Sequence, residues 1–205
     1  MDLEKKVYRA LKEGIFTFKY IAGQKLQYQD LADQYEVSSM IIKSVLTLLQ
    51  QEGLVTRQPQ KGYHVTEITT KEAEDLFEMR TIIELSAVEK AITNFNQQAY
   101  DELYQRYLRS AEALGSRITE NYFMHDRDFH LQIAEMGGNR ILLSDLKRTM
   151  ERIFLRYGAE GLSVARNEAA SDEHLRIYQA IGERDVSLAK QEIMTHLDNV
   201  VHLIR

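Results

Sequence analysis

The sequence predicts a mainly α-helical protein in two domains, a small head over residues 1–68 and a larger body over residues 69–205. The chain contains one proline and ten glycines, so few residues interrupt its helices. Apolar residues recur every three or four positions over most of the chain, which is the period of an α-helix. Two strand-like segments at 54–57 and 63–66 break this pattern, and they mark the end of the head.

The head begins with an amphipathic helix. Leu3, Val7, Leu11 and Ile15 recur every four residues, and they predict a helix that ends near Tyr20. The other elements expected in the head are a short strand at 25–26, a helix over 29–35, a turn at 36–38, a helix that Ser38 caps and Glu52-Gly53 ends, and two strands at 54–57 and 63–66 that form a hairpin.

This order of elements is that of a winged helix-turn-helix. In that motif the second helix of the turn enters the major groove of DNA, and the hairpin, or wing, lies near the phosphates or the minor groove. The run LADQYEVSSMIIKSVLTLLQQEGLVTRQPQKGYHV (31–65) resembles the GntR family of bacterial regulators, whose pattern contains LA, VS, L..L..EGLV and a wing with glycine. The resemblance implies a regulator that binds double-stranded DNA.

The recognition helix departs from the GntR pattern at three positions. The family usually has arginine where this chain has Ser39 and Lys43, and proline where it has Ile41. Arginine pairs with guanine through two parallel hydrogen bonds that serine and lysine do not reproduce, so we expect an unusual operator and weaker binding. The residues expected to contact DNA are Ser38, Ser39, Lys43, Arg57, Lys61 and Gly62. The alternative is that they are ordinary surface residues of a head that contacts protein.

The body is predicted to be an all-α helical bundle. Residues 69–72 form a polar junction, in which Thr69 and Glu72 have the spacing of a capping box. Gly137-Gly138 separates two helices, and residues 158–167 form a looser connection. The helices are expected as a first one that carries Leu76, Met79, Ile83 and Val88, followed by others at 96–114, 118–136, 139–157, 171–183 and 186–204.

Four residues of the body form a candidate metal site. Asp126 and His130 are four residues apart, so both side chains project from one face of a helix. His174 is expected in the first turn of the fifth helix, and His196 lies on the apolar face of the sixth helix with Ile193. Three imidazoles and one carboxylate suit zinc, nickel, manganese or iron. A single histidine on an apolar face is more often a hydrogen-bonded core residue, so the spacing leaves both interpretations open.

Three segments of the body resemble the FCD effector domain of the FadR subfamily of GntR regulators. They are EDLFEMRTIIELSAVEKAI (74–92), DRDFHLQIAEMGGNRIL (126–142) and EHLRIYQAIGERDVSLAKQEIMTHLDNV (173–200). In metal-binding members an Asp-x-x-x-His pair and two later histidines hold the ion. The resemblance therefore implies a divalent metal ion, zinc first and nickel, manganese or iron as alternatives. Its ligands would be Asp126, His130, His174 and His196.

Arg80 matches an arginine of the family's first effector helix. The resemblance implies that it pairs with a small organic acid, such as a hydroxy acid, a sugar acid or a dicarboxylate. The alternative is a salt bridge to Glu84, four residues further along the same helix. Asn139 is expected to cap the fourth helix of the body. The histidines outside the metal pattern are expected to be surface or hydrogen-bonding residues; they are His64, His125 and His202.

Charge and composition favour a DNA-binding head on a different kind of body. Residues 1–66 hold nine Lys and Arg against seven Asp and Glu, whereas the whole chain has 26 against 31. A mildly basic head on an acidic body is typical of a DNA-binding module attached to another domain. The chain has no cysteine and no apolar run of about 18 residues. We therefore expect a cytoplasmic protein that has no membrane partner.

The sequence favours a regulator over an enzyme. The resemblance implies a homodimer that binds near-palindromic DNA. An effector would shift the arrangement of its heads toward or away from the DNA-bound state. A metal-dependent enzyme is the alternative, since such sites also activate water. Glu135 and Glu173 are the candidate general bases, although both occupy helix positions where solvated glutamates are usual. A metal store or structural adaptor without DNA binding is the other alternative.

Overall fold

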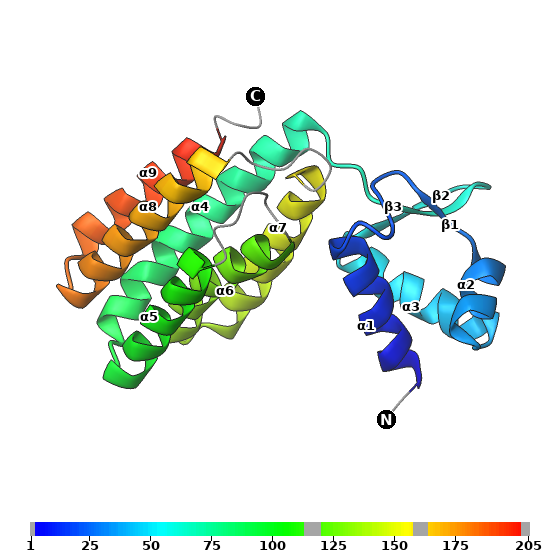
Figure 1. The fold of residues 1–205 in the computed structure, drawn as a ribbon, viewed down its shortest axis with the longest axis horizontal. Coiled ribbons are helices and arrows are strands. Elements are labelled where there is room, and N and C mark those ends of the chain that lie inside the picture. The colour runs from blue at the N-terminus through cyan, green and yellow to red at the C-terminus, as the bar shows by residue number, and fades with distance from the viewer. Residues whose placement is uncertain (1–2, 113–119, 158–163, 202–205) are drawn as a thin grey trace. The chain divides into compact units, whose positions relative to one another are not determined.

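A computed structural model describes residues 3–112, 120–157 and 164–201 (Figure 1). Within these ranges the chain forms nine helices and a small three-stranded sheet, as the sequence predicts. The chain divides into two compact units, and the main division lies between Thr69 and Thr70. Among the described residues, no helix is both long and apolar enough to cross a membrane.

The first unit contains the expected head elements in the expected order. They are α1 (Leu3–Phe16), β1 (Lys25–Leu26), α2 (Tyr28–Tyr35), α3 (Ser39–Gln51), β2 (Val55–Gln58) and β3 (Gly62–Val65).

The first helix ends at Phe16 rather than near Tyr20, so this predicted boundary was wrong. Phe18 has a left-handed φ of 57°, and the Tyr20 amide donates to the Gly14 carbonyl across 3.0 Å. The buried Tyr20 ring then lies against the helix, where a Cβ on Gly14 would come within 2.6 Å of it. The apolar period continues because Tyr20 folds back onto the core after the helix has ended.

Helix α3 and the hairpin form as predicted. The Ser38 side chain accepts a hydrogen bond from the Ile41 amide across 3.4 Å and so caps α3. The sheet has the order β1-β3-β2 with antiparallel pairs, and β2 and β3 are the strands of the wing. The face of α3 toward the core buries four apolar side chains, those of Ile42, Val45, Leu46 and Leu49.

The second unit is a bundle of six helices, which matches the predicted number. They are α4 (Thr70–Thr93), α5 (Gln97–Glu112), α6 (Glu120–Met136), α7 (Arg140–Tyr157), α8 (Val164–Gly182) and α9 (Val186–Val201). Asn139 caps α7 as predicted, because its side-chain oxygen accepts from the amides of Ile141 and Leu142. Three predicted features lie outside the described residues. They are the helix boundaries at 113–119, the connection at 158–163 and His202.

Helix α8 begins at Val164 rather than at residue 171, so the predicted start was wrong. The segment 164–170 is rich in alanine, which favours helix without producing an apolar period. The apolar pattern of the sequence therefore indicates only the later part of the helix. As a result His174 lies near the middle of α8 and not in its first turn.

One apolar core connects five helices of the bundle. Phe129 and Ile133 of α6 pack with Leu103 of α5, and Val88 of α4 joins the same core. Helices α8 and α9 contribute Ile177, Ala180, Ile181, Ala189, Ile193 and Leu197. A smaller cluster of Ile83, Ala87, Ala134, Leu146 and Met150 packs α7 against α4 and α6. This core fixes the helix faces that carry the candidate site.

Candidate metal centre

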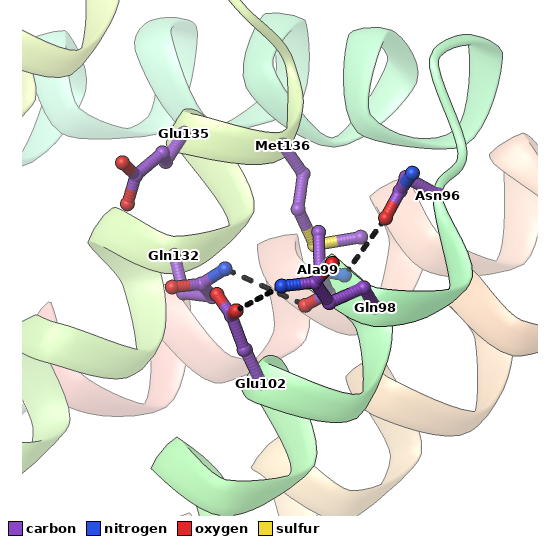
Figure 2. A pocket seen from close by; sticks show the side chains of 7 residues that line it. All are labelled: Asn96, Gln98, Ala99, Glu102, Gln132, Glu135 and Met136. Carbon is purple, nitrogen blue, oxygen red and sulfur yellow. Dashed lines mark hydrogen bonds between the residues drawn. The ribbon is translucent and has the colours of Figure 1, made fainter.

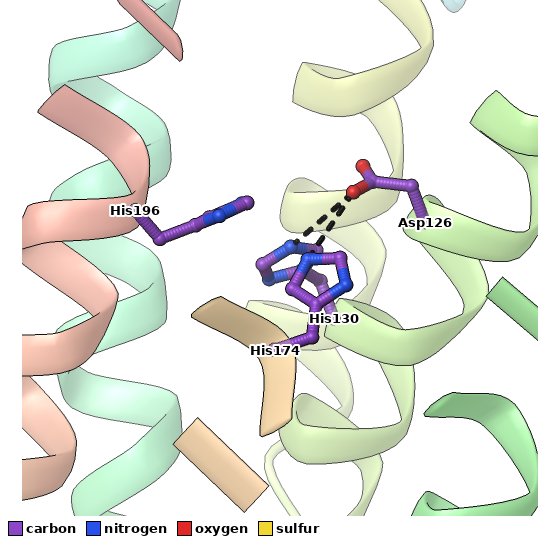
Figure 3. Close-up of side chains that lie close together, drawn as sticks. All are labelled: Asp126, His130, His174 and His196. Atoms are coloured by element: carbon purple, nitrogen blue, oxygen red, sulfur yellow. Dashed lines mark ion pairs between the residues drawn. The ribbon is translucent and has the colours of Figure 1, made fainter. Parts of the chain in front are cut away.

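The four predicted metal ligands lie together inside the helical unit (Figure 3). Each offers one ligand atom, and all four atoms lie within 4.8 Å of one another. Helix α6 supplies Asp126 and His130, α8 supplies His174, and α9 supplies His196. The bundle thus brings together residues that are up to 70 positions apart in the chain.

The helical period explains why these imidazoles point inward. His130 follows Phe129, and His196 lies on the same face of α9 as Ile193, as the sequence indicates. His174 is stacked on Phe129 with ring centroids 4.5 Å apart. Each of the three histidines is at most 1% exposed, so burial of the apolar faces carries the imidazoles into the core.

The ligand atoms converge on one small region. The Nε2 atom of His174 lies 3.3 Å from Asp126 Oδ1, and the Nε2 atom of His130 lies 3.9 Å from the same oxygen. The ring centroids of the three histidines are separated by 4.7 to 5.1 Å. A single carboxylate and three imidazoles therefore face a common point.

Two buried glutamates orient two of the imidazoles. His130 donates from Nδ1 to Glu84 Oε2, and His196 donates from Nδ1 to Glu173 Oε2, each across 2.7 Å. This leaves Nε2 of both rings with its lone pair directed toward the cluster, which is the usual arrangement of metal-binding histidines. Neither role was predicted from the sequence, because neither glutamate has a regular spacing from the histidine that it contacts.

The cluster fits a bound cation by its donor atoms. Nε2 of His130 and both ring nitrogens of His174 are buried and make no hydrogen bond, although buried polar atoms are normally bonded. A metal ion held at about 2.1 Å keeps its ligand atoms within roughly 4.2 Å of one another. The observed set therefore needs to close only slightly, and three nitrogens with one oxygen suit zinc and similar ions.

The protonation states also suit a cation. Burial lowers the pKa of His196 to about 3 and lowers that of His174 as well, against the effect of the nearby carboxylates. Burial by itself would raise the pKa of Asp126, but His174, His130 and Arg80 outweigh it and hold the pKa below its ordinary value. At neutral pH these two imidazoles are neutral and the carboxylate is charged, which are the forms that bind metals.

Arg80 is paired with Glu84. This salt bridge is one of the two interpretations that the sequence leaves open. The Arg80 side chain donates from Nε to Glu84 Oε1 across 2.5 Å, and both residues are buried. Burial opposes ionisation of Glu84, but its hydrogen bonds and electrostatic interactions with His130 and Arg80 lower its pKa to about 2. Glu84 therefore connects the guanidinium to a candidate metal ligand, and the Arg80 charge also acts on Asp126.

The expectation that Glu173 is solvated was wrong. Glu173 is only 4% exposed, and its oxygens accept hydrogen bonds from His196 and Asn199. Packing of α8 against α9 buries a position that helix periodicity alone places at the surface. Glu173 thus orients a ligand and is not placed as a general base.

Glu135, the other candidate base, is exposed as expected and lines a different pocket (Figure 2). This pocket of about 270 Å³ lies between α5 and α6, and none of the four cluster residues lines it. Its polar lining is internally bonded, for example from Gln98 to Glu102 and from Gln132 to the Ala99 carbonyl. Glu135 therefore lies away from the candidate metal centre.

The residues expected to contact DNA lie on α3 and the wing. Ser38, Ser39 and Lys43 are exposed at the N-terminal end of α3. Arg57 and Lys61 are exposed on the hairpin, and the Arg57 guanidinium lies 6.0 Å from the ring centroid of Tyr63. Gly62 is half-buried with a φ of 94°, so its backbone shapes the wing. Met40, which was not predicted to contact DNA, is 81% exposed on α3.

Comparison with known families identifies both units. Residues 3–65 match the family "Bacterial regulatory proteins, gntR family", and residues 75–199 match the FCD domain. The chain belongs to the GntR family of regulators with an FCD domain. It is accordingly a DNA-binding transcriptional regulator, as the resemblance of its motifs implies.

Similar proteins agree with this assignment over nearly the full chain. HTH-type transcriptional repressor GlaR of Escherichia coli is 27% identical, covering 97% of this chain and 94% of its own length. The uncharacterised HTH-type transcriptional regulator YdhC of Bacillus subtilis is 24% identical, covering 94% and 86%. Among solved structures, E. coli McbR/YncC has a TM-score of 0.86 with 19% identity, covering 100% of this chain and 97% of the other. The structural likeness supports the fold.

Proposed function

We propose that the FCD domain of this GntR regulator binds one divalent metal ion and a small organic acid. The metal ligands would be Asp126, His130, His174 and His196, with zinc as the first candidate and nickel, manganese or iron as alternatives. The observation that carries the proposal is the convergence of three buried imidazoles and the half-buried Asp126 carboxylate, with ring nitrogens of His130 and His174 that make no hydrogen bond. A bound cation would offer open coordination positions to a carboxylate.

Arg80 is the proposed partner of the organic acid. Its guanidinium is buried beside the cluster and donates to Glu84, and a planar guanidinium matches the geometry of a carboxylate. The charge of Arg80 acts on Asp126 and His174, which supports a position close to the bound acid.

The DNA-binding function is assigned to residues 1–68 and the sensing function to residues 69–205. We propose that Ser38, Ser39, Lys43, Arg57, Lys61 and Gly62 contact the operator, and that the protein binds near-palindromic DNA in the cytoplasm as a homodimer. The exposure of the α3 N-terminal end and of the two wing cations supports this surface. Binding of the acid would change the affinity for DNA only as far as it favours one head arrangement.

Elemental analysis of purified protein tests the metal site. We expect about one metal ion per wild-type chain and a loss of most of it in His174→Ala, since three remaining ligands bind more weakly. His125→Ala is the matched control, because His125 is a neighbouring histidine of α6 outside the predicted set. An unchanged metal content in His174→Ala would exclude the assignment.

Thermal shift in a panel of hydroxy acids, sugar acids and dicarboxylates then tests the effector site. An acid that binds should stabilise the metal-loaded protein, stabilise the chelated protein less, and lose its effect in Arg80→Ala. The same acid should change salt-sensitive binding to the DNA upstream of the protein's own coding sequence. Equal stabilisation of the wild type and Arg80→Ala would remove Arg80 from the site.

A further inference from the structure

Met40 is an exposed apolar residue on the helix that is expected to enter DNA. It is the second residue of α3, and its exposed fraction is 81%. Among the residues whose side chains the structure describes, the other exposed large hydrophobic side chains have lower exposed fractions. Ser38, two residues before Met40, caps the N-terminus of the helix. A side chain in the first turn of a recognition helix is placed where base edges are contacted.

Met40 begins an exposed stripe along α3. Lys43, Thr47 and Gln50 follow at helical spacing and are all exposed, while the opposite face of the helix is buried in the core. The stripe therefore contains one cation and two polar side chains, which suit the major groove of DNA and its flanking phosphates. One apolar residue lies at its N-terminal end. The exposed cations of the wing, Arg57 and Lys61, favour a polyanion as the partner of this surface.

We propose that Met40 contacts the C5 methyl group of a thymine in the major groove and so contributes to the choice of operator. The thymine methyl is the apolar feature of that groove, and the flexible Met side chain adapts its shape to such a group. This inference rests on the proposed DNA contacts of the head.

The role is one of specificity and not of stability. Because Met40 is exposed, its replacement by alanine should leave the free energy of unfolding nearly unchanged. Loss of an apolar contact about the size of a methyl group should weaken binding about fourfold for each half-site.

The test removes the methyl group from the DNA and the side chain from the protein separately. Duplexes that bind the wild-type full chain are first selected from a random-sequence library. Fluorescence anisotropy then measures Kd for a selected duplex and for copies in which each thymine in turn is replaced by deoxyuridine, which lacks only the C5 methyl group. The proteins compared are the wild type, Met40→Ala, Met40→Leu and the control Met194→Ala, which changes a 47% exposed methionine of α9.

We expect one thymine per half-site at which deoxyuridine weakens wild-type binding about fourfold. Met40→Ala should bind the unmodified duplex more weakly by a similar factor and should not respond to deoxyuridine at that position, whereas Met40→Leu and Met194→Ala should respond. Wild-type insensitivity at every thymine, or a persistent response in Met40→Ala, overturns the inference. A wild-type protein that selects no duplex contradicts the proposed DNA contacts and this contact together.

Discussion

Two buried glutamates act on the candidate metal centre without belonging to its ligand set. Glu84 and Glu173 each accept the Nδ1 proton of a ligand histidine, and such partners hold the tautomer and the ring orientation that a metal requires. Glu84 also pairs with Arg80. One carboxylate thus links the proposed metal site to the proposed anion site.

Glu84→Ala and Glu173→Ala should each weaken zinc binding, by about 10- to 100-fold, because the released imidazole loses its orientation. Competition with a chelating dye measures the affinity. Glu84→Gln should lose less than Glu84→Ala, because an amide oxygen still accepts from His130. Glu89→Ala is the control, since Glu89 lies on the same helix but pairs with Lys190 at the surface. Wild-type affinity in both alanine variants would show that the two hydrogen bonds are incidental.

At the scale of elements, the wing depends on one backbone conformation. Gly62 pairs with Gln58 at the end of the hairpin and has a φ of 94°. A Cβ there would meet only the end of the Lys25 side chain at 3.8 Å. The conformation of the backbone, and not a lack of space, requires glycine at this position.

Gly62→Ala should lower the free energy of unfolding by about 1–3 kcal/mol, the cost of a side chain in a sparsely populated backbone region. Lys61→Ala should leave the free energy of unfolding unchanged. It should reduce the slope of the logarithm of DNA affinity against the logarithm of salt concentration by about one. Urea unfolding and DNA titrations at several salt concentrations separate the two effects. Equal stability of Gly62→Ala and the wild type would contradict the backbone argument.

At the scale of the whole molecule, the buried histidines make stability depend on pH. The pKa values of His174 and His196 are lower in the folded protein than the ordinary value of 6.5, so the unfolded chain binds protons that the folded chain does not. The free energy of unfolding of chelated protein should therefore fall as the pH falls below about 6.5. Glu84 has a pKa of about 2 in the folded protein against an ordinary value of 4.5. Its protonation therefore lowers the free energy of unfolding further only as the pH falls from about 4.5 to about 2.

Urea unfolding of chelated protein between pH 7.5 and 5.5 measures this loss. Near pH 5.5 each of the two histidines should contribute a slope of roughly 1 kcal/mol per pH unit. Replacement of His174 and His196 by Gln should flatten the profile in this window, whereas His125→Ala should leave it unchanged. Stability that stays constant or rises toward pH 5.5 in the wild type would contradict neutral burial of these imidazoles.

The order of the elements and the class of the fold follow from the sequence pattern, whereas the four members of the cluster were named through the resemblance to the FCD domain. Local physics supplies part of this: the helical period places His196 with Ile193, and the four-residue spacing places Asp126 beside His130. Caps were equally visible, because Ser38 and Asn139 act on amides two or three residues away. The family motifs added the assignment of the head to DNA.

The tertiary structure alone decided which groups support the cluster. The hydrogen bond from His130 to Glu84 spans 46 positions and that from His196 to Glu173 spans 23, and no local pattern encodes such pairs. The early end of α1 likewise depends on Tyr20 folding back onto Gly14. Apolar periodicity shows that a face is buried, whereas the polar partner that the face meets depends on how the helices pack.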